Sequence, residues 1–488
     1  MTTIHDQAMN YVYQQVLQRL LSFFSRAERT ALQLLIQRLL VAAGGMEHIG
    51  SFKVLVIQSG SRDSCYTLAL LRAAQLSLAG RAPATFQLRV ASLRLNGNSH
   101  GALQNMHRSY GALFLYDDPR VELLMVDHRQ VAPFDFQSVV SEASREANRV
   151  NLLMSGHRRT SNEILELWDD AYLATAEFYS QIARWNNGVD AMIGAEPPRR
   201  QTLFLEGLNR AALKAGIGGL PANHRGFEAL FPMLDGLGSD YYRHFYTEGE
   251  QLPWRPEGQF EACRRSSFID INDMIVGKLE ERWPLLSDFL GFQADDLTLH
   301  QGDHEFVEPL VAAHLHGLHA SVIEDQTYES GVAVYLQDTL ATLRRNQVPE
   351  PVCEHLLATY GNLLDLEQRR IHAASHLQET FNLSENQLTC LLFAPFIDSG
   401  AGLEIFLRKC HPGMLVALPD LHRAMQGLHA PEQVMKWMTE VSGLPVKLIA
   451  RLYAMSAIQI PESPEQQSSQ KPATAVTQTA ANERSAEG

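Results

Sequence analysis

The fold of this chain is decided by one short stretch, Lys53-Val54-Leu55-Val56-Ile57-Gln58-Ser59-Gly60-Ser61-Arg62-Asp63-Ser64. Its first five residues form a continuous run that is mostly apolar and β-branched, which is typical of a strand buried on both faces of a sheet. A polar loop of small residues follows, and a helical pattern extends from Cys65 to about Ala79. A buried strand that leads directly into a loop and a helix is the opening unit of a parallel α/β sheet.

The alternation of strands and helices continues along the chain to about residue 183. Short apolar runs between polar loops predict strands, and longer stretches with apolar residues three and four apart predict helices. We expect strands at 86–95, 121–126 and 150–154, and helices at 101–115, 137–149 and 162–183. This order of elements predicts an α/β fold with a doubly wound parallel sheet.

An N-terminal helical hairpin, residues 1–49, precedes this α/β unit, which we place at residues 50–267. The apolar spacing over 7–43 is helical and predicts two helices. Between them, Ser25 and Glu28 have the spacing of a capping box, in which each side chain satisfies an exposed backbone N–H group of the other residue. The second helix therefore begins at this point.

The remainder of the chain changes in character twice. Residues 184–265 have an irregular pattern, interrupted by proline and glycine. From 268 to 460 the pattern is almost wholly helical with no convincing strand, which predicts a C-terminal all-α domain. Residues 461–488 contain almost no large apolar side chain, and we expect them to form a disordered tail.

Composition and charge limit the classes of function. The 488 residues are 45% hydrophobic and 20% charged, as in ordinary globular proteins. The formal net charge of −14 means that the surface as a whole repels phosphate backbones. Arginine pairs at 158–159, 199–200 and 264–265 still allow a local basic patch, so tRNA stays possible. A small-molecule or protein substrate is supported at least equally well.

The sequence gives no sign of secretion or of a membrane partner. No uncharged apolar run reaches the roughly 18 residues of a membrane span, and the start at Met1 lacks the features of a secretory signal. The five cysteines are odd in number and no two form a CxxC pair, which argues against a disulfide framework and a cysteine-based metal centre. We expect a cytoplasmic protein, with homodimerisation through the N-terminal or C-terminal helices as an open possibility.

The loop Ser59–Ser64 is the candidate ligand-binding site. A short loop of small residues that opens a helix presents backbone N–H groups and the positive end of the helix dipole to an anion. The Ser59 and Ser64 hydroxyls add donors, Arg62 can reach a phosphate, and Asp63 can hold a magnesium ion or orient the loop. The alternative is an ordinary polar turn in which Asp63 or Ser64 only caps the helix.

The loop resembles the strand–SGGxDS–helix motif of the PP-loop ATP pyrophosphatases, which include the tRNA(Ile)-lysidine and tRNA 2-thiocytidine synthetases. These enzymes cleave ATP between the α- and β-phosphates and adenylate a carbonyl oxygen, after which an amine or sulfur nucleophile attacks. The resemblance implies a PP-loop (HUP-like) sheet, with ATP and Mg²⁺ as cofactors and Asp63 as a metal-binding and catalytic residue. It implies that ATP is bound by Ser59, Gly60, Ser61, Arg62, Asp63 and Ser64.

Two later segments extend the resemblance to about residues 50–290. Residues 150–165 are similar to the fourth strand of the family and its GHHxDD segment, which implies that His157 lies near the adenylate or stabilises developing negative charge. Residues 231–254, with Phe-Pro-Met-Leu, Tyr-Tyr and Leu-Pro-Trp, are similar to a stretch of the lysidine synthetases.

The chain also departs from the family pattern. Ser61 takes the place of the second glycine, where a side chain obstructs a positive φ or the close approach of phosphate. Arg158 replaces the second histidine, and Thr160 and Ser161 replace two acidic residues unless a shift brings Glu163 into their place. The chain is therefore either a diverged member with another substrate or a nucleotide site that has lost its chemistry.

Histidine and carboxylate side chains are concentrated in the predicted helical domain. Such residues can bind a metal in a helical bundle, although their spacing matches no metal motif and favours a histidine-rich amphipathic surface. The group consists of His300, His304, Glu305, Glu308, His314, His316, His319, Glu367, His372 and His376.

The sequence thus favours an ATP-dependent adenylating enzyme that forms AMP and pyrophosphate while activating a carbonyl oxygen of a small molecule, a tRNA base or a protein. The alternative is a degenerate, non-catalytic PP-loop protein that binds nucleotide or serves as an interaction scaffold. A metal-dependent enzyme of the helical domain is a third reading.

Overall fold

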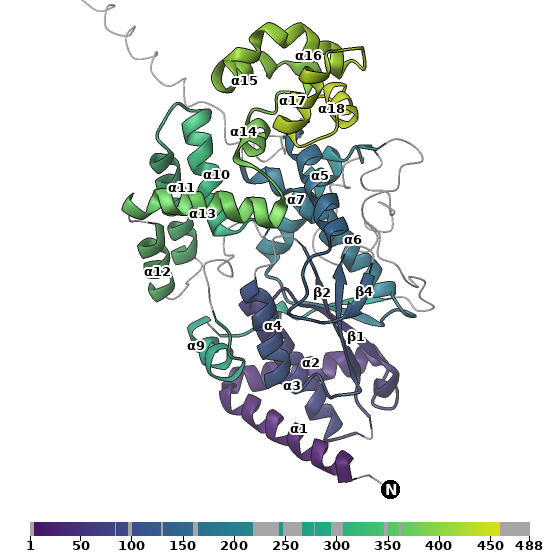
Figure 1. The fold of residues 1–488 in the computed structure, drawn as a ribbon. Helices are drawn as coiled ribbons and strands as arrows, with labels where there is room; N and C mark the ends of the chain where they lie inside the picture. The colour runs from purple at the N-terminus through teal and green to yellow at the C-terminus, as the bar shows by residue number, and fades with distance from the viewer. Residues whose placement is uncertain are drawn as a thin grey trace, which may run out of the picture.

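The fold is organised around one mostly parallel β-sheet. A computed structural model describes residues 4–82, 84–95, 100–127, 130–159, 164–217, 244–246, 266–277, 279–293, 306–345, 350–360 and 363–458. Within them the strands are β1 Lys53–Ile57, β2 Gln87–Leu93, β3 Val121–Asp127, β4 Gln130–Pro133, β5 Ala191–Gly194 and β6 Ser267–Asp270. They lie in the order β4-β3-β2-β1-β5-β6, and β4 alone of these is antiparallel, to β3 (Figure 1).

The direction in which the chain crosses the sheet reverses at β1. From β1 it proceeds through β2 to β3, and it later returns to the other side of β1 with β5 and then β6. In open α/β sheets, ligands bind in the crevice outside the carboxyl ends of the strands at such a reversal. The predicted α/β class is confirmed, and the topology directs attention to the ends of β1 and β5.

Helices on one face of the sheet include the N-terminal hairpin. They share one apolar core with Val54 and Val56 of β1, and the predicted capping box of Ser25 and Glu28 is present. The hairpin therefore packs onto the sheet unit rather than standing apart from it. The helices are α1 Ile4–Phe23, α2 Arg26–Ala43, α3 Arg62–Ala79, α4 His100–Ala112 and α9 Leu279–Pro284, the last followed by a π-helical turn Leu285–Phe289.

The opposite face is covered by α6 (Asp170–Arg184), where Phe178 and Ile182 pack against Leu55 of β1. The flanking helices are α5 Glu142–His157 and α7 Pro198–Lys214, with a 3₁₀ turn at Ile164–Trp168. In Figure 1 these helices lie between the sheet and the C-terminal helices.

The C-terminal helices share a second large apolar core with α5, α6 and α7 rather than forming a core of their own. Their 3₁₀ turns lie at Asp398–Gly400 and Pro412–Ala417. The helices are α10 Pro309–Val322, α11 Tyr328–Arg345, α12 Glu350–Tyr360, α13 Leu363–Phe381, α14 Glu385–Phe393, α15 Leu403–Cys410, α16 Leu418–Met425, α17 Glu432–Ser442 and α18 Val446–Tyr453.

Three sequence-based predictions about the elements are wrong. Residues 150–154 are not a strand but the second half of α5, because a short apolar run buried on all sides has the same pattern in a helix as in a parallel strand. The stretch 184–265 is not wholly irregular, since it contains β5 and α7. The region from 268 contributes to the sheet through β6, whose four residues are too short for a clear pattern.

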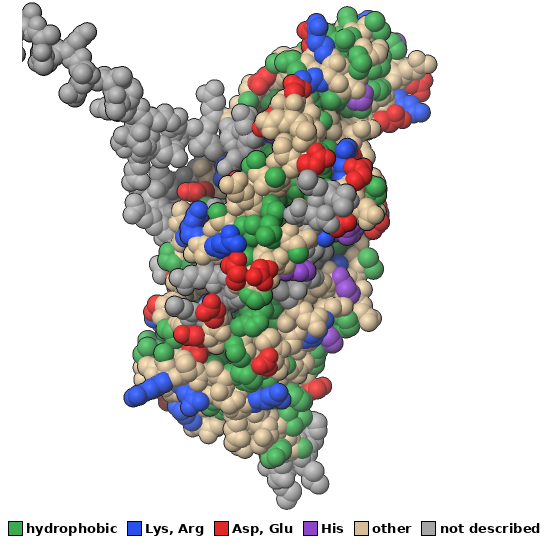
Figure 2. Space-filling model, turned by 90° about the vertical axis from the view of Figure 1, so that its left-hand side faces the viewer, with side chains coloured by type: hydrophobic (Ala, Val, Ile, Leu, Met, Phe, Trp, Pro, Cys, Tyr) green, Lys and Arg blue, Asp and Glu red, His purple; other side chains and the backbone are tan. Residues whose placement is uncertain are grey.

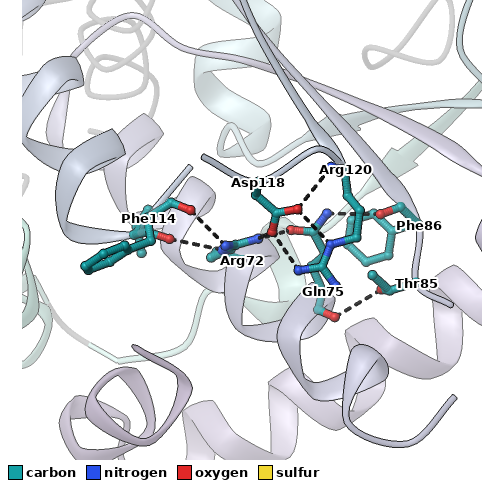
Figure 3. A network of polar contacts seen from close by, with 8 residues as sticks. Arg72, Gln75, Thr85, Phe86, Phe114, Asp118 and Arg120 are labelled. Carbon is teal, nitrogen blue, oxygen red and sulfur yellow. Dashed lines mark hydrogen bonds and ion pairs between the residues drawn. The ribbon is translucent and has the colours of Figure 1, made fainter. Parts of the chain in front are cut away.

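A buried polar network fixes α3 to the sheet. The Arg72 guanidinium donates to Asp118 at 2.8 Å and to the carbonyl oxygens of Leu113 and Phe114 (Figure 3). Arg120 also donates to the Asp118 carboxylate, and the Gln75 side-chain amide donates to the carbonyl oxygen of Phe86 at 3.0 Å. These hydrogen bonds tie α3 to the segments that precede β2 and β3.

No helix within the described ranges is both long and apolar enough to cross a membrane. The expected disordered tail, 461–488, lies outside the residues that the structure describes.

Candidate functional site

A cavity of about 270 Å³ lies at the reversal point of the sheet. Its floor consists of the carboxyl ends of β1, β2 and β5, and its walls include residues of α3, α5, α6 and α7. The loop Ser59–Ser61 and Ser64 line it, as do Gly194 and Arg200. This switch-point cavity is therefore placed where doubly wound sheets bind their ligands.

Gly60 is the residue that the loop geometry requires most strictly. Its φ of +75° lies in the left-handed region that side chains rarely adopt. A Cβ atom there would lie 2.3 Å from the carbonyl oxygen of Ala102 at the start of α4. The glycine thus lets the loop pass directly beneath α4 while its backbone stays at the edge of the cavity.

Three serine hydroxyls, those of Ser59, Ser61 and Ser64, form a compact group that we term the serine cluster. Their oxygen atoms lie 3.0 to 3.3 Å from one another, and the Ser64 hydroxyl also donates to Gln58 Oε1. Ser61 is the N-cap of α3 and accepts from Ser64 N at 3.3 Å. Hydroxyls grouped at a helix N-terminus can turn their protons toward a bound anion.

The serine at position 61 does not strain the loop. Its φ of −72° and ψ of 159° are extended, so no glycine is needed at this position for backbone reasons. The departure from the SGGxDS pattern therefore leaves the loop conformation intact and adds a hydroxyl at the helix start.

Asp63 lies among arginines rather than among other metal ligands. Its carboxylate is 3.5 Å from Arg62, 3.6 Å from Arg200 and 3.9 Å from Arg282. Burial alone raises the pKa of Asp63, but the three guanidinium groups outweigh burial and hold its pKa below the usual value. Arg200 lines the cavity and Asp63 does not, and Glu196, 3.6 Å from Arg200, lines it as well.

A protein-held magnesium ion does not fit this arrangement. Within the described part of the chain, no three His, Cys, Asp or Glu side chains are placed to hold a metal ion. Asp63 has three cations around it, which disfavours a further cation at the same carboxylate. A magnesium ion at this site would therefore arrive with the phosphates of an MgATP substrate.

His157 is not brought to the loop. It is the last residue of α5, is fully buried, does not line the cavity and lies 5.5 Å, centroid to centroid, from Phe396. Burial, with a smaller contribution from Arg159, lowers the pKa of His157 to about 3. The neutral imidazole therefore brings no positive charge to a developing anion. Its neighbours Thr160, Ser161 and Glu163 lie outside the described residues, as does the segment 231–254 apart from residues 244–246.

Sequence reasoning missed the acidic pair beside the cavity. Asp169 is buried between Lys214 at 2.7 Å and Arg210 at 3.2 Å, whereas Asp170 lines the cavity. Burial, reinforced by the neighbouring Asp169, raises the pKa of Asp170 well above its usual value. The only signal in the sequence was two adjacent acids after Trp168 in an otherwise apolar stretch.

Three histidines of the histidine-rich group in the helical region make pairwise contacts. His376 lies 2.7 Å from the buried Glu308, His314 2.9 Å from the Tyr328 hydroxyl, and His319 3.3 Å from Glu324. The described members form no metal site. His300, His304 and Glu305 lie outside the described residues.

Comparison with known proteins identifies no relative. A scan against protein-family models finds no match, and neither do searches of curated proteins and of solved structures. The resemblance to PP-loop enzymes therefore rests on the sequence motifs alone.

Proposed function

We propose that the switch-point cavity binds ATP and that the chain is an ATP-dependent adenylating enzyme. The observation that carries this proposal is the loop at the end of β1. There Gly60 adopts a left-handed backbone conformation and adds no side chain, and the serine cluster places three hydroxyls at the start of α3. Such an arrangement is suited to phosphate oxygens, and the resemblance to the SGGxDS motif supports the same ligand.

The residues at the mouth of the cavity have separate tasks in this proposal. The serine cluster and the N-terminus of α3 donate hydrogen bonds to phosphate oxygens, and Arg200 supplies positive charge from α7. Asp63 keeps Arg62, Arg200 and Arg282 close together while no anion is bound, because it offsets part of their mutual repulsion.

The reaction that the resemblance implies is a phosphoryl displacement. The carbonyl oxygen of the acceptor attacks the α-phosphorus of MgATP, the bond from that phosphorus to the bridging oxygen breaks, and pyrophosphate leaves with the electron pair. A nucleophile then displaces AMP. Arginine side chains at the site stabilise the charge that develops on the phosphate oxygens.

A small acceptor is favoured over tRNA. The cavity of about 270 Å³ is near the lower end of the volumes of small-molecule sites, and the chain carries a net charge of −14. On the face shown in Figure 2, Lys and Arg side chains occur in small groups among acidic ones rather than as a continuous basic surface. A protein that binds tRNA usually presents a continuous basic surface.

A second candidate, a nucleotide-binding protein without catalysis, is favoured by one observation. The segment similar to the catalytic GHHxDD motif begins inside α5, and its His157 is buried away from the cavity lining. The two candidates share ligand binding and differ in turnover.

The first test is calorimetric titration with MgATP of the wild type, of Gly60→Ala and of Gly111→Ala. We expect saturable binding by the wild type and a loss of at least ten-fold in affinity for Gly60→Ala, because its Cβ atom meets Ala102 O. Gly111 is the matched control, since a Cβ atom there contacts nothing within 4 Å.

Absence of wild-type binding contradicts the proposal. If binding is present, pyrophosphate release in the presence of candidate acceptors separates the enzyme from the non-catalytic protein.

A further inference from the structure

Most of the side chains that line the switch-point cavity are apolar, and they come from the sheet and from the helices that cover it. Leu93 of β2 and Met192 of β5 belong to the apolar core between the sheet and α6, whereas Leu152 and Phe204 belong to the core shared with the C-terminal helices. The cavity is therefore bordered by two apolar cores. Because protein interiors are otherwise close-packed, space of this size beside two cores indicates a site for the apolar part of a ligand.

One face of α6 forms part of this apolar wall. Ala171, Ala174 and Phe178 line the cavity, and their spacing of three and four residues places them on the same side of the helix. The two alanines are buried, yet neither is a member of the three apolar cores found among the described residues. Their short side chains leave space that larger residues at these positions would fill.

The charged part of the lining lies on other elements. The serine cluster follows β1, and Arg200, on α7, is the only Lys or Arg among the described residues that line the cavity. Glu196 lies 3.6 Å from Arg200. On α6, burial, reinforced by Asp169, raises the pKa of Asp170 well above its usual value, which favours the uncharged carboxyl group. The cavity thus combines one cation near the strand ends with a wall on α6 that carries little charge.

We propose that the acceptor is a monocarboxylic acid with a hydrocarbon or aromatic body, which packs against α6 while its carboxylate faces Arg200. An apolar cavity of about 150 Å³ accommodates a benzene ring, so this larger cavity has room for a ring with a short chain. A second carboxylate on the ligand is unfavourable, because it would be buried beside apolar side chains or would face Glu196.

The inference rests on the proposed function, since the carboxylate oxygen is then the atom that attacks the α-phosphorus of MgATP. Two anions must approach each other in that step. A cation that faces both the carboxylate and the phosphate lowers their repulsion, and Arg200 is placed for this task by its position beside the serine cluster in the cavity lining.

The first test is calorimetric titration of the full chain with hexanoate, hydrocinnamate, adipate and acetate, with and without magnesium and α,β-methylene ATP, which cannot be cleaved at the α,β position. Adipate has as many carbons as hexanoate but carries a second carboxylate in place of the terminal methyl group. Because each buried methylene contributes about four-fold in affinity, we expect hexanoate or hydrocinnamate to bind tighter than acetate and adipate by about ten-fold or more. Equal affinities, or no binding of either apolar acid, overturn the inference.

The nucleotide analogue also separates the acceptor from the nucleobase as the occupant of the apolar wall. We expect the analogue and the apolar acid to bind together, each with an affinity that the other does not lower. Displacement of the acid by the analogue assigns the apolar wall to the nucleobase and overturns the inference.

Two variants test the two ends of the acid. Ala174→Leu fills space at the α6 wall and should weaken binding of the apolar acid by about ten-fold, whereas the control Ala42→Leu, at an exposed position of α2, leaves it unchanged. Arg200→Gln should weaken the acid by about ten-fold but leave the alcohol with the same carbon skeleton unaffected. An unchanged affinity in Ala174→Leu, or equal losses for acid and alcohol in Arg200→Gln, contradicts the proposal.

The comparison of hexanoate with adipate uses the wild type alone, so it decides the matter even where a variant fails to fold. Failure of this inference is also distinguishable from failure of the proposed function. Binding of MgATP that Gly60→Ala weakens, without binding of any apolar acid, overturns the inference and leaves ATP binding in place. Binding of an apolar acid without binding of MgATP overturns the proposed function.

Discussion

Asp118 and Asp63 each lie among arginine side chains, yet the contacts differ in length and number. Asp118 accepts from Arg72 at 2.8 Å, and from the Arg120 side chain at 2.6 Å and backbone N–H at 3.0 Å, with its side chain fully buried. Asp63 is 3.5 to 3.9 Å from three arginines and is 24% exposed.

The difference indicates two roles for the same residue types. Arg72 and Arg120 make short, directional hydrogen bonds to Asp118, and these bonds fix α3 to the segment that precedes β3 (Figure 3). Longer contacts around Asp63 hold charge near the cavity without fixing one geometry. An anion can therefore draw Arg200 away from Asp63 at little cost, whereas nothing replaces Asp118 for Arg72.

The largest effect should come from Asp118→Asn. The substitution leaves the Arg72 guanidinium buried without its carboxylate, so we expect a loss of about 3–5 kcal/mol in the free energy of unfolding. Denaturant unfolding of this variant and of Asp63→Asn measures the contrast. Equal losses of unfolding free energy in the two variants would show that the shorter contacts of Asp118 do not give it a greater structural role than Asp63.

The stability of the protein in acid should also depend on the Asp118 carboxylate. Burial raises the pKa of Asp118, but Arg120 and Arg72 outweigh burial and lower it from 3.8 to about 2. Because the folded-state pKa is depressed, the stabilisation is complete above about pH 4 and is lost as the pH falls toward 2. It amounts to roughly 2 kcal/mol. Unfolding measured from pH 5 to pH 2 should show this loss in the wild type and a smaller loss in Asp118→Asn.

A smaller effect is expected at Tyr13 of α1. The guanidinium groups of Arg72 and Arg120 lie 5.1 Å and 4.9 Å from the centre of its ring. Tyr13→Leu removes both cation–π contacts and should lower stability by about 1–2 kcal/mol. Tyr11→Leu, at a ring that is 64% exposed, is the control and should change stability by less than about 0.5 kcal/mol.

Asp63→Asn should have the smallest effect on stability. It is also the variant that tells most about function. Long and partly exposed ion pairs contribute little, so stability should change by less than about 1 kcal/mol. Removing a negative charge beside Arg200 should raise the affinity for inorganic pyrophosphate, titrated without magnesium, by about two- to five-fold. A metal ligand at Asp63 would instead be detected as a loss of MgATP affinity with no gain for pyrophosphate.

Local sequence was sufficient for the units whose pattern is set by neighbouring residues. β1, the loop at Ser59–Ser64 and α3 were predictable because a β-branched run, a glycine and a helix cap act within a few residues of one another. The N-terminal helix pair was predictable for the same reason, through Ser25 and Glu28.

Short apolar segments were not predictable, because burial removes the periodicity that separates strand from helix. Residues 150–154 became part of α5 since α14 and α18 pack against that helix, and the place beside β1 was taken by the four-residue β5. The same error placed His157 after a strand, whereas it is the last residue of α5.

The sequence by itself determined the α/β class and predicted an anion-binding loop after β1. Both follow from residue types adjacent in the chain. Only the tertiary structure decided what surrounds that loop: arginines from α3, α7 and α9 meet Asp63, and aromatic rings from distant segments line the cavity. These contacts join residues far apart in sequence, where no local pattern specifies which side chains will meet.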